Sequence, residues 1–300
     1  MEIIKVVPRG YCQGVVRAIQ TAEKTARENS GQPIYMLGMI VHNRFVVEAC
    51  EKLGIHCLEA KGKTRLELLD EIDHGTVIFT AHGVSDAVYE KAAAKGLHIV
   101  DATCPDVRKT HDLIRDHVAH GDVLYIGKKN HPEAEGAVGI SPRVHLISCR
   151  EDLAKLGPLE NVLITNQTTL SILDNQALIE ACLKQYPDAV AQEEICNATT
   201  MRQKAVMNLS SADCLIVVGD PHSNNTNQLR EIGIKAGIPN AVLIENAMML
   251  KESDILGYKT VAVTSGSSTP NAITDGVIET LEHYSKTGLF EPVPLPDSVI

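Results

Sequence analysis

The sequence contains very few aromatic residues: no Trp, three Phe and seven Tyr among 300 residues. Proteins that bind single-stranded nucleic acid stack the bases on aromatic side chains, so this composition predicts no such surface. The 38 acidic residues outnumber the 28 basic ones, which gives a formal net charge of −10. This charge disfavours general binding to phosphate backbones, and we therefore expect no nucleic-acid partner.

The sequence also lacks a membrane or export segment. No stretch approaches the ~20 consecutive apolar residues that span a bilayer. Residues Met1–Pro8 show no basic segment followed by a cleavable apolar one. We therefore expect a cytoplasmic protein with no membrane partner. Because disulfides are rare in that compartment, the eight cysteines are expected to be reduced thiols, metal ligands or catalytic groups.

Several common ligand motifs are absent as well. The sequence has neither Gly-x-Gly-x-x-Gly nor Gly-x-x-x-x-Gly-Lys-Ser/Thr, so dinucleotides and P-loop nucleotides are not indicated. It has no Cys-x-x-Cys pair, the spacing typical of zinc sites. With 44% hydrophobic and 22% charged residues, the chain is otherwise typical of a globular protein with an aliphatic core.

What the sequence does contain is a repeat. Cys12, Cys104 and Cys196 follow one another at intervals of 92 residues, and the segments after them correspond. In each repeat a strand-like run ends in Gly, and a polar residue follows four positions later: His42, His131 and Ser223. A second strand-like run in each repeat ends in Thr before a polar turn: Thr80, Thr165 and Thr264.

This order predicts an α/β fold of three pseudo-symmetric α/β units with short parallel sheets. The strands are short continuous apolar runs, as expected for parallel strands covered on both faces. We place the units at residues 13–103, 104–195 and 196–283, with the N-terminal strand in 1–12 completing the ring and 284–300 as a C-terminal tail. Ligands bind at the carboxyl ends of parallel strands, where the polar loops lie. With three-fold symmetry these loops would meet around one central site.

Three thiolates at one point could bind zinc or an iron–sulfur cluster. Ligands this far apart in sequence favour a [4Fe–4S] cluster. Three cysteines would leave one of its irons without a protein ligand. That open iron could act as a Lewis acid while the cluster supplies electrons. The alternative for any cytoplasmic cysteine is a buried, inert thiol. We adopt that alternative for the other five: Cys50, Cys57, Cys149, Cys182 and Cys214.

The polar loops hold almost no Lys or Arg. Residues Gly266–Pro270 form a candidate phosphate nest, with helix capping as the alternative. Histidines near a diphosphate can be cationic and donate hydrogen bonds to it. Glu133 is the one carboxylate in the loop cores, which makes it a candidate proton donor; its alternative is a solvated loop acid or a helix cap.

These segments together resemble the 4-hydroxy-3-methylbut-2-enyl diphosphate reductase family of the non-mevalonate isoprenoid pathway. The resemblance runs in matching order from the N-terminus to about Gly276. The matching motifs are Pro8–Val15, Val41–Asn43, Ala81–Ser85, Asp101–Pro105, His131–Gly136, Gln167–Thr169, Ile195–Thr199 and Ser223–Asn227.

The resemblance implies a trefoil around a [4Fe–4S] cluster that Cys12, Cys104 and Cys196 hold as metal ligands. The cluster would show as [3Fe–4S], or be absent, after oxidation. The substrate hydroxyl would bind the unique iron, with Glu133, His131 and Thr168 as catalytic residues. The implied substrate-binding residues are His42, His82, His131, Thr168, Ser223, Asn224, Asn225 and Ser268. Some family members carry Ser at the position of Asn224. A contact from the Asn224 side chain to the diphosphate is therefore not implied, but its backbone amide could still make one.

The implied reaction is reductive dehydroxylation of (E)-4-hydroxy-3-methylbut-2-enyl diphosphate to isopentenyl and dimethylallyl diphosphate. The electron donor would be ferredoxin or flavodoxin. Two other functions stay open. One is an iron–sulfur hydro-lyase that acts on a small anionic substrate without net electron transfer, which reductant dependence would distinguish. The other is an iron–sulfur sensor, which would need no diphosphate pocket.

Overall fold

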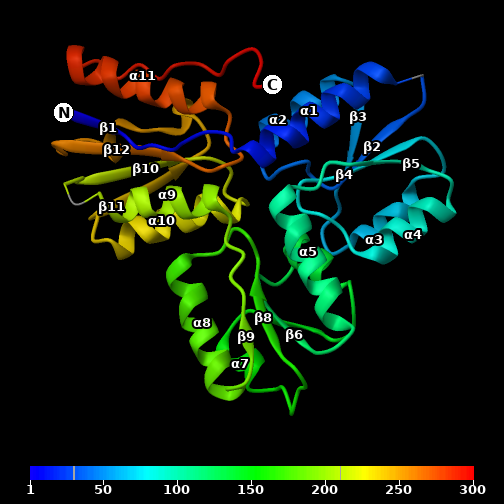
Figure 1. The fold of residues 1–300 in the computed structure, drawn as a ribbon. Coiled ribbons are helices and arrows are strands. Elements are labelled where there is room, and N and C mark those ends of the chain that lie inside the picture. The colour runs from blue at the N-terminus through cyan, green and yellow to red at the C-terminus, as the bar shows by residue number, and fades with distance from the viewer. Residues whose placement is uncertain (30, 210) are drawn as a thin grey trace. The chain divides into compact units, whose positions relative to one another are not determined.

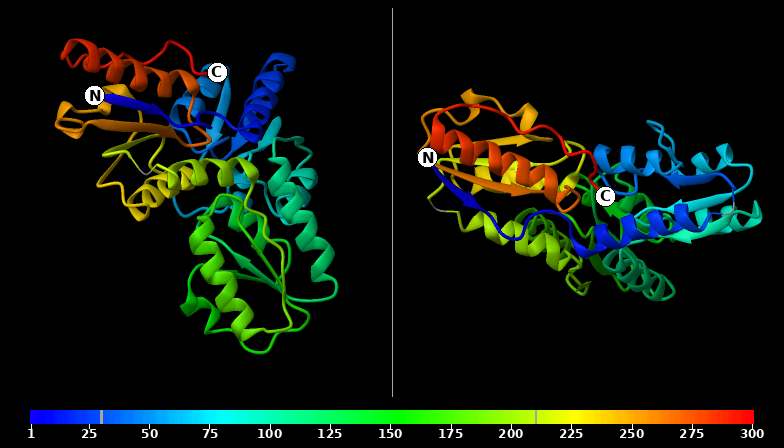
Figure 2. Two further views of the ribbon diagram at one scale, coloured as in Figure 1. Left: turned by 60° about the vertical axis from the view of Figure 1, so that its left-hand side comes forward. Right: turned by 90° about the horizontal axis from the view of Figure 1, so that it is seen from above.

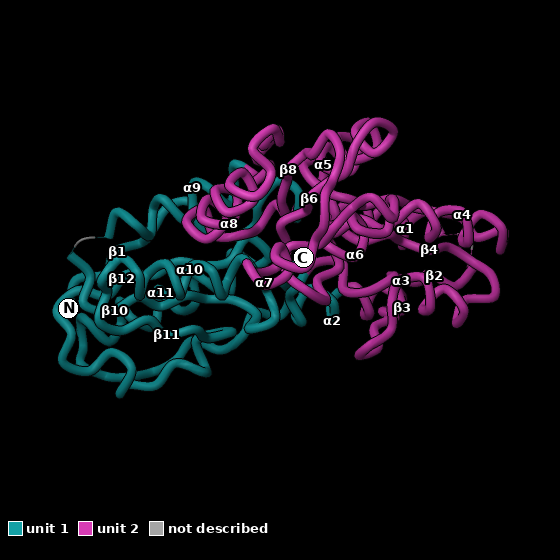
Figure 3. Tube along the Cα trace, turned by 90° about the horizontal axis from the view of Figure 1, so that it is seen from below, with its two compact units in different colours: residues 1–15, 42–49, 197–300 teal, residues 16–41, 50–196 magenta. Residues whose placement is uncertain are grey.

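Twelve parallel strands form three separate four-stranded sheets in the structure, a computed structural model that describes residues 1–29, 31–209 and 211–300 (Figure 1). The sheet orders are β3-β2-β4-β5, β7-β6-β8-β9 and β1-β12-β10-β11. The predicted α/β class with three short parallel sheets is confirmed. The chain divides into two compact units, residues 1–15, 42–49 and 197–300 (unit 1) and residues 16–41 and 50–196 (unit 2) (Figure 3).

The first sheet of unit 2 contains β2 (Ile34–Leu37), β3 (Ile55–Leu58), β4 (Thr76–Phe79) and β5 (His98–Asp101). One face packs against the short helix α3 (Arg65–Leu68) and α4 (Asp86–Ala94) through Val77 and Phe79. The long helix α1 (Gln13–Glu28) lies over the other face (Figure 1). The helix α2 (Arg44–Lys52) leads from β2 to β3.

The second sheet of unit 2 contains β6 (Val123–Ile126), β7 (Val144–Ile147), β8 (Leu163–Asn166) and β9 (Val190–Ala191). Leu124 and Ile126 pack with α7 (Arg150–Leu153) and α8 (Ile172–Gln185), whereas Val123 and Tyr125 pack with α5 (Pro105–Val118) and α6 (Pro132–Val138). Alternate residues of a strand point to opposite faces, so each apolar run needs a helix layer on both sides.

Unit 1 contains the third sheet, made of β1 (Glu2–Lys5), β10 (Cys214–Val218), β11 (Asn240–Ile244) and β12 (Thr260–Ser265). The helix α11 (Asn271–Thr287) covers one face, and α9 (Asn197–Met207) and α10 (Asn224–Lys235) cover the other (Figure 2). Two short 3-10 helices, Ala247–Met249 and Glu252–Asp254, follow β11. The N-terminal strand β1 pairs with β12, with Glu2 opposite Thr260.

The C-terminal segment lies against unit 1. The helix α11 runs to Thr287 and ends at Gly288, which adopts the left-handed conformation. Beyond it, Phe290 and Val299 pack onto the core on the α11 side of the sheet, and the Tyr11 hydroxyl donates to the Val299 carbonyl at 3.1 Å. In the described part of the chain we find no helix that combines the length and the apolar character needed to cross a bilayer.

Candidate functional site

Each sheet places its polar loops at the point where the strand order reverses. The chain leaves β2 toward β3 on one side and returns through β4 on the other, and β6 and β8 do the same in the second sheet, as do β10 and β12 in the third. Loops after such a central pair diverge and leave a crevice, which is where ligands bind in parallel sheets. The loops after these six strands carry six of the substrate-binding residues predicted from the sequence: His42, His82, His131, Thr168, Ser223 and Ser268.

The three repeat cysteines occupy equivalent positions. Cys12, Cys104 and Cys196 each directly precede a long helix: α1, α5 and α9. The backbone N–H of each donates to a carbonyl in the polar loop of its own unit: Cys104 to Ala81 at 3.0 Å, Cys196 to Thr168 at 3.1 Å and Cys12 to Ser267 at 3.1 Å. All three cysteines therefore lie at helix N-termini, the ends of a helix that favour negative charge.

The remaining cysteines have a different environment. Burial raises the pKa of Cys50, Cys182 and Cys214 to about 11 and that of Cys57 to about 12, so these thiols stay neutral. The Cys149 thiol donates to Asp152 Oδ2 at 3.5 Å. None of the eight cysteines, all in the described ranges, forms a disulfide.

Glu133 lies buried at the start of α6, with 2% of its surface exposed. Its Oε1 accepts the backbone N–H of Thr168 at 2.6 Å. Burial raises the pKa of Glu133 to about 7, and the like charge of Asp106 also raises it. The backbone and hydroxyl donors of Thr168 act in the opposite direction and lower it. The alternative of a solvated loop acid is therefore wrong. A carboxyl group with this pKa can release a proton at neutral pH.

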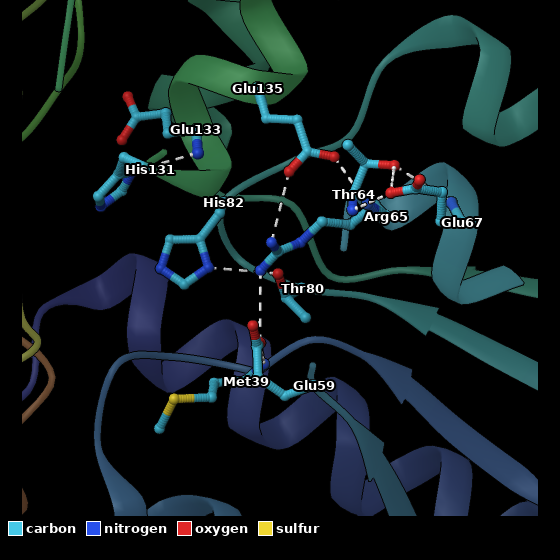
Figure 4. Close-up of polar contacts among 10 residues, drawn as sticks. All are labelled: Met39, Glu59, Thr64, Arg65, Glu67, Thr80, His82, His131, Glu133 and Glu135. Carbon is cyan, nitrogen blue, oxygen red and sulfur yellow. Dashed lines mark hydrogen bonds and ion pairs between the residues drawn. The ribbon is translucent and has the colours of Figure 1, made fainter. Parts of the chain in front are cut away.

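His131 precedes α6 as its N-cap. Its Nδ1 accepts the backbone N–H of Glu133 at 3.2 Å, so Nδ1 carries no proton. The His82 ring lies edge-on to that of His131, with centroids 5.7 Å apart, and its Nδ1 is 3.3 Å from Thr80 Oγ1 (Figure 4). Unit 2 therefore gathers four of the predicted site residues: His82, His131, Glu133 and Thr168.

Unit 1 contains the other predicted substrate-binding residues, three of them at the start of α10. Ser223 is its N-cap and accepts the Thr226 N–H, and Asn224 and Asn225 form its first turn, both buried. The Ser268 hydroxyl donates to the His42 carbonyl at 2.9 Å, and Asn225 Oδ1 accepts the Ser267 N–H at 2.9 Å.

The loop at 266–270 connects β12 to α11. The Thr269 hydroxyl donates to the Val218 carbonyl at 3.0 Å, and α11 begins after Pro270 without a side-chain cap. Pro270 is the N-cap residue, so no side chain of this loop caps α11, and the phosphate nest stays a prediction.

Two buried residues near these loops were not predicted. Arg202, on α9, donates from Nη2 to the Gly10 carbonyl at 2.7 Å and so supports the loop before Cys12. His111, on α5, lies against α6: a Cβ on Gly136 would come within 3.2 Å of its Cε1. Burial lowers the His111 pKa to about 4, so the ring is neutral. The sequence signal for His111 is a polar residue on a helix face that also carries Val107 and Ile114. Arg202 shares the buried face of α9 with Thr199 and Gln203, so the sequence gives no comparable signal for it.

The residues present fit an iron–sulfur cluster in their chemistry. Two of the thiols lie in unit 2 and one in unit 1, each at a helix N-terminus. Within neither unit, as far as residues 1–29, 31–209 and 211–300 describe it, do three His, Cys, Asp or Glu side chains gather so that they could hold a metal ion by themselves.

Comparison with known proteins places this geometry in context. A family model described as LytB protein matches residues 3–282. A protein of Symbiobacterium thermophilum named 4-hydroxy-3-methylbut-2-enyl diphosphate reductase is 52% identical over 291 residues, which cover 95% of this chain and 98% of that protein. A protein of Brevibacillus brevis with the same name is 51% identical over 291 residues, which cover 95% and 93%.

Two solved structures are also similar. The E-1-hydroxy-2-methyl-but-2-enyl-4-diphosphate reductase of Plasmodium falciparum superposes with a TM-score of 0.88 at 30% identity, covering 99% of this chain and 95% of that one. A structure of (E)-4-hydroxy-3-methyl-but-2-enyl diphosphate reductase gives a TM-score of 0.65 at 30% identity, covering 94% and 100%.

Proposed function

The chain belongs to the LytB protein family, and from that membership we propose that it converts (E)-4-hydroxy-3-methylbut-2-enyl diphosphate to isopentenyl and dimethylallyl diphosphate. The family resemblance predicted from the sequence is thereby confirmed. The chain is an oxidoreductase of isoprenoid biosynthesis. The observation that supports the site assignment most directly is a hydrogen bond that recurs in all three repeats. The backbone N–H groups of Cys12, Cys104 and Cys196 each donate to a carbonyl of a polar loop that carries proposed substrate-binding residues.

Cys12, Cys104 and Cys196 are the proposed ligands of a [4Fe–4S] cluster. When bound, a cluster with three protein thiolates supplies electrons and a Lewis-acidic iron with an open position. The three helix N-termini next to these thiols favour an anionic group. The domain boundaries 13–103, 104–195 and 196–283 stay a prediction, as does the arrangement of the units around one centre.

Glu133 is the proposed acid. Because its Oε1 accepts the Thr168 N–H, Oε2 is the proposed position of the transferred proton. Because His131 Nδ1 accepts the Glu133 N–H, neutral His131 carries its proton on Nε2 and is a donor there. The side chains of Glu133, His131 and Thr168 would thus bind the substrate hydroxyl and deliver a proton as water leaves.

The diphosphate would bind mainly to neutral donors. The N-terminus of the twelve-residue helix α10, with Ser223, Asn224 and Asn225, offers amides and the positive end of a helix dipole. We propose His42, Ser268 and His82 as further ligands. The sequence predicts a cytoplasmic enzyme, and we propose ferredoxin or flavodoxin as its electron donor.

The test is anaerobic reconstitution with iron and sulfide, followed by a turnover assay with the diphosphate substrate and a chemical reductant. We expect about four irons per chain and reductant-dependent formation of both products. Conversion without reductant would support the hydro-lyase alternative. A reconstituted cluster whose EPR spectrum does not respond to the diphosphate, with no turnover, would support the sensor alternative.

A further inference from the structure

Arg65 is a buried arginine between two carboxylates of unit 2. It is the first residue of α3, and its side chain is 9% exposed. Its Nη1 lies 3.4 Å from Glu135 Oε2 and its Nη2 lies 3.5 Å from Glu59 Oε2 (Figure 4). A guanidinium so far removed from water requires charged partners, and it leaves a large penalty when one partner is removed.

The contact with Glu135 involves the backbone as well. Glu135 Oε1 accepts the Arg65 backbone N–H at 2.7 Å, so both carboxylate oxygens are directed at one residue. Glu135 belongs to α6, the helix that begins after His131 and carries Glu133. Residues two positions apart on a helix point about 200° away from each other. The helix α6 is therefore fixed on one side through Glu133 to Thr168 and on the other through Glu135 to Arg65.

The second nitrogen of the Arg65 guanidinium, Nη2, is anchored at the first sheet of unit 2. Glu59 directly follows β3, and its Oε2 also accepts the Met39 N–H, just after β2, at 3.2 Å. A Cβ on Gly38 would lie 2.7 Å from Arg65 Nη2, and Gly38 has a φ of +96°. The positive φ favours glycine at 38, and without a Cβ there the guanidinium can lie close against the backbone after β2.

We propose that Arg65 is a positioning residue that, through Glu135, fixes the first turn of α6 and thereby the direction of Glu133 and His131. Arg65 connects the carboxyl ends of β2 and β3 to α6 and does not itself touch the substrate. The inference rests on the proposed function and deepens it. It predicts that loss of Arg65 impairs the step that uses Glu133 more than it impairs binding of the diphosphate.

The test compares Arg65→Gln and Glu135→Gln with a matched control, Arg143→Gln. Arg143 also forms a part-buried pair in unit 2, 3.5 Å from Asp122 Oδ2, but it precedes β7 at the opposite end of the strands. We expect both test variants to lower kcat by about tenfold while KM changes less than about twofold, because a misplaced catalytic group affects turnover. Arg65→Lys should recover part of the loss, and Arg143→Gln should keep the wild-type kcat.

Amide hydrogen exchange of the cluster-free protein provides a readout that does not depend on turnover. Arg65→Gln should lower protection in α6 without lowering it in α8 or α11, and Arg143→Gln should leave α6 unchanged. Glu135→Gln keeps an acceptor for the Arg65 N–H, so it serves if Arg65→Gln does not fold. Wild-type kcat together with wild-type exchange in α6 in a folded variant would overturn the inference. An inactive wild type would refute the proposed function, and the α6 exchange would still decide the role of Arg65.

Discussion

The pKa of Glu133 makes a direct prediction about the pH dependence of turnover. A proton donor must be protonated, so the rate should fall as pH rises through the Glu133 pKa of about 7. About nine-tenths of the enzyme would carry the proton at pH 6 and about one-tenth at pH 8. A glutamate with the ordinary pKa of 4.5 would be protonated about 150-fold less often at pH 7 than the buried Glu133.

The informative perturbation is Thr168→Val. The Thr168 hydroxyl lowers the pKa of Glu133, so its removal should raise this pKa, while the backbone N–H of residue 168 still donates to Oε1. A lost hydrogen bond to a carboxylate corresponds to about one pH unit. The ratio of the rate at pH 8 to that at pH 6 should then rise about fivefold, even though the absolute rate falls because Thr168 is a proposed catalytic residue.

The assay is kcat against pH under anaerobic conditions, together with infrared difference spectra of the protonated carboxyl group in the cluster-free protein, assigned with Glu133→Gln. Thr165→Val is the matched control. Thr165 lies in β8, the strand that directly precedes the Thr168 loop, and its buried hydroxyl has no hydrogen-bond partner among the described residues. Its profile should match the wild type. If Thr168→Val moves the alkaline limb to lower pH or leaves it in place, Glu133 does not control the limb.

Three other variants test separate parts of the site. The pKa of Glu133 rises from 4.5 in the unfolded chain to about 7 in the folded protein, so its contribution to stability is fully present below pH 4.5 and is lost as pH rises through about 7. Glu133→Gln should therefore raise the free energy of unfolding at pH 8 by about 3 kcal/mol. Chemical denaturation that shows no such gain would contradict this prediction. Cys104→Ser should lose the reconstituted cluster, whereas Cys149→Ser should keep about four irons per chain in an iron analysis. Equal loss of iron in both variants would refute the assignment of the cluster ligands from the repeat. Arg202→Met removes the donor to the Gly10 carbonyl and should speed cluster loss under chelator several-fold; a wild-type rate of loss would exclude support of the Cys12 loop by Arg202.

The repeat made most of the fold predictable from the sequence. The spacing of Cys12, Cys104 and Cys196, with a Gly-ended and a Thr-ended strand in each period, was enough to predict three short parallel sheets. The two strands of each period are the adjacent central strands of one sheet, so the polar loops had to lie at one edge. Periodicity succeeds here because each α/β unit is a local unit of sequence.

The contacts around Glu133 and Glu135 could not be predicted from this spacing. Arg65 and Glu135 are 70 residues apart and lie on helices that pack against different sheets, and no spacing rule relates them. The environment of Glu133 also includes a neighbouring loop, since its Oε1 accepts the N–H of Thr168, which follows β8. The division into two compact units, with residues 42–49 grouped with 197–300, likewise arises from packing between distant segments.

The loops of unit 1 that are proposed to bind the diphosphate, residues 219–225 and 265–270, contain no Lys or Arg. In a chain of net charge −10, such a site gains little from long-range attraction, so raising the ionic strength should barely weaken it. Recognition would then depend on how well the shape and the acceptors of the anion match fixed amides and hydroxyls. Simple inorganic anions at cellular concentrations would compete poorly with the organic substrate for the same loops.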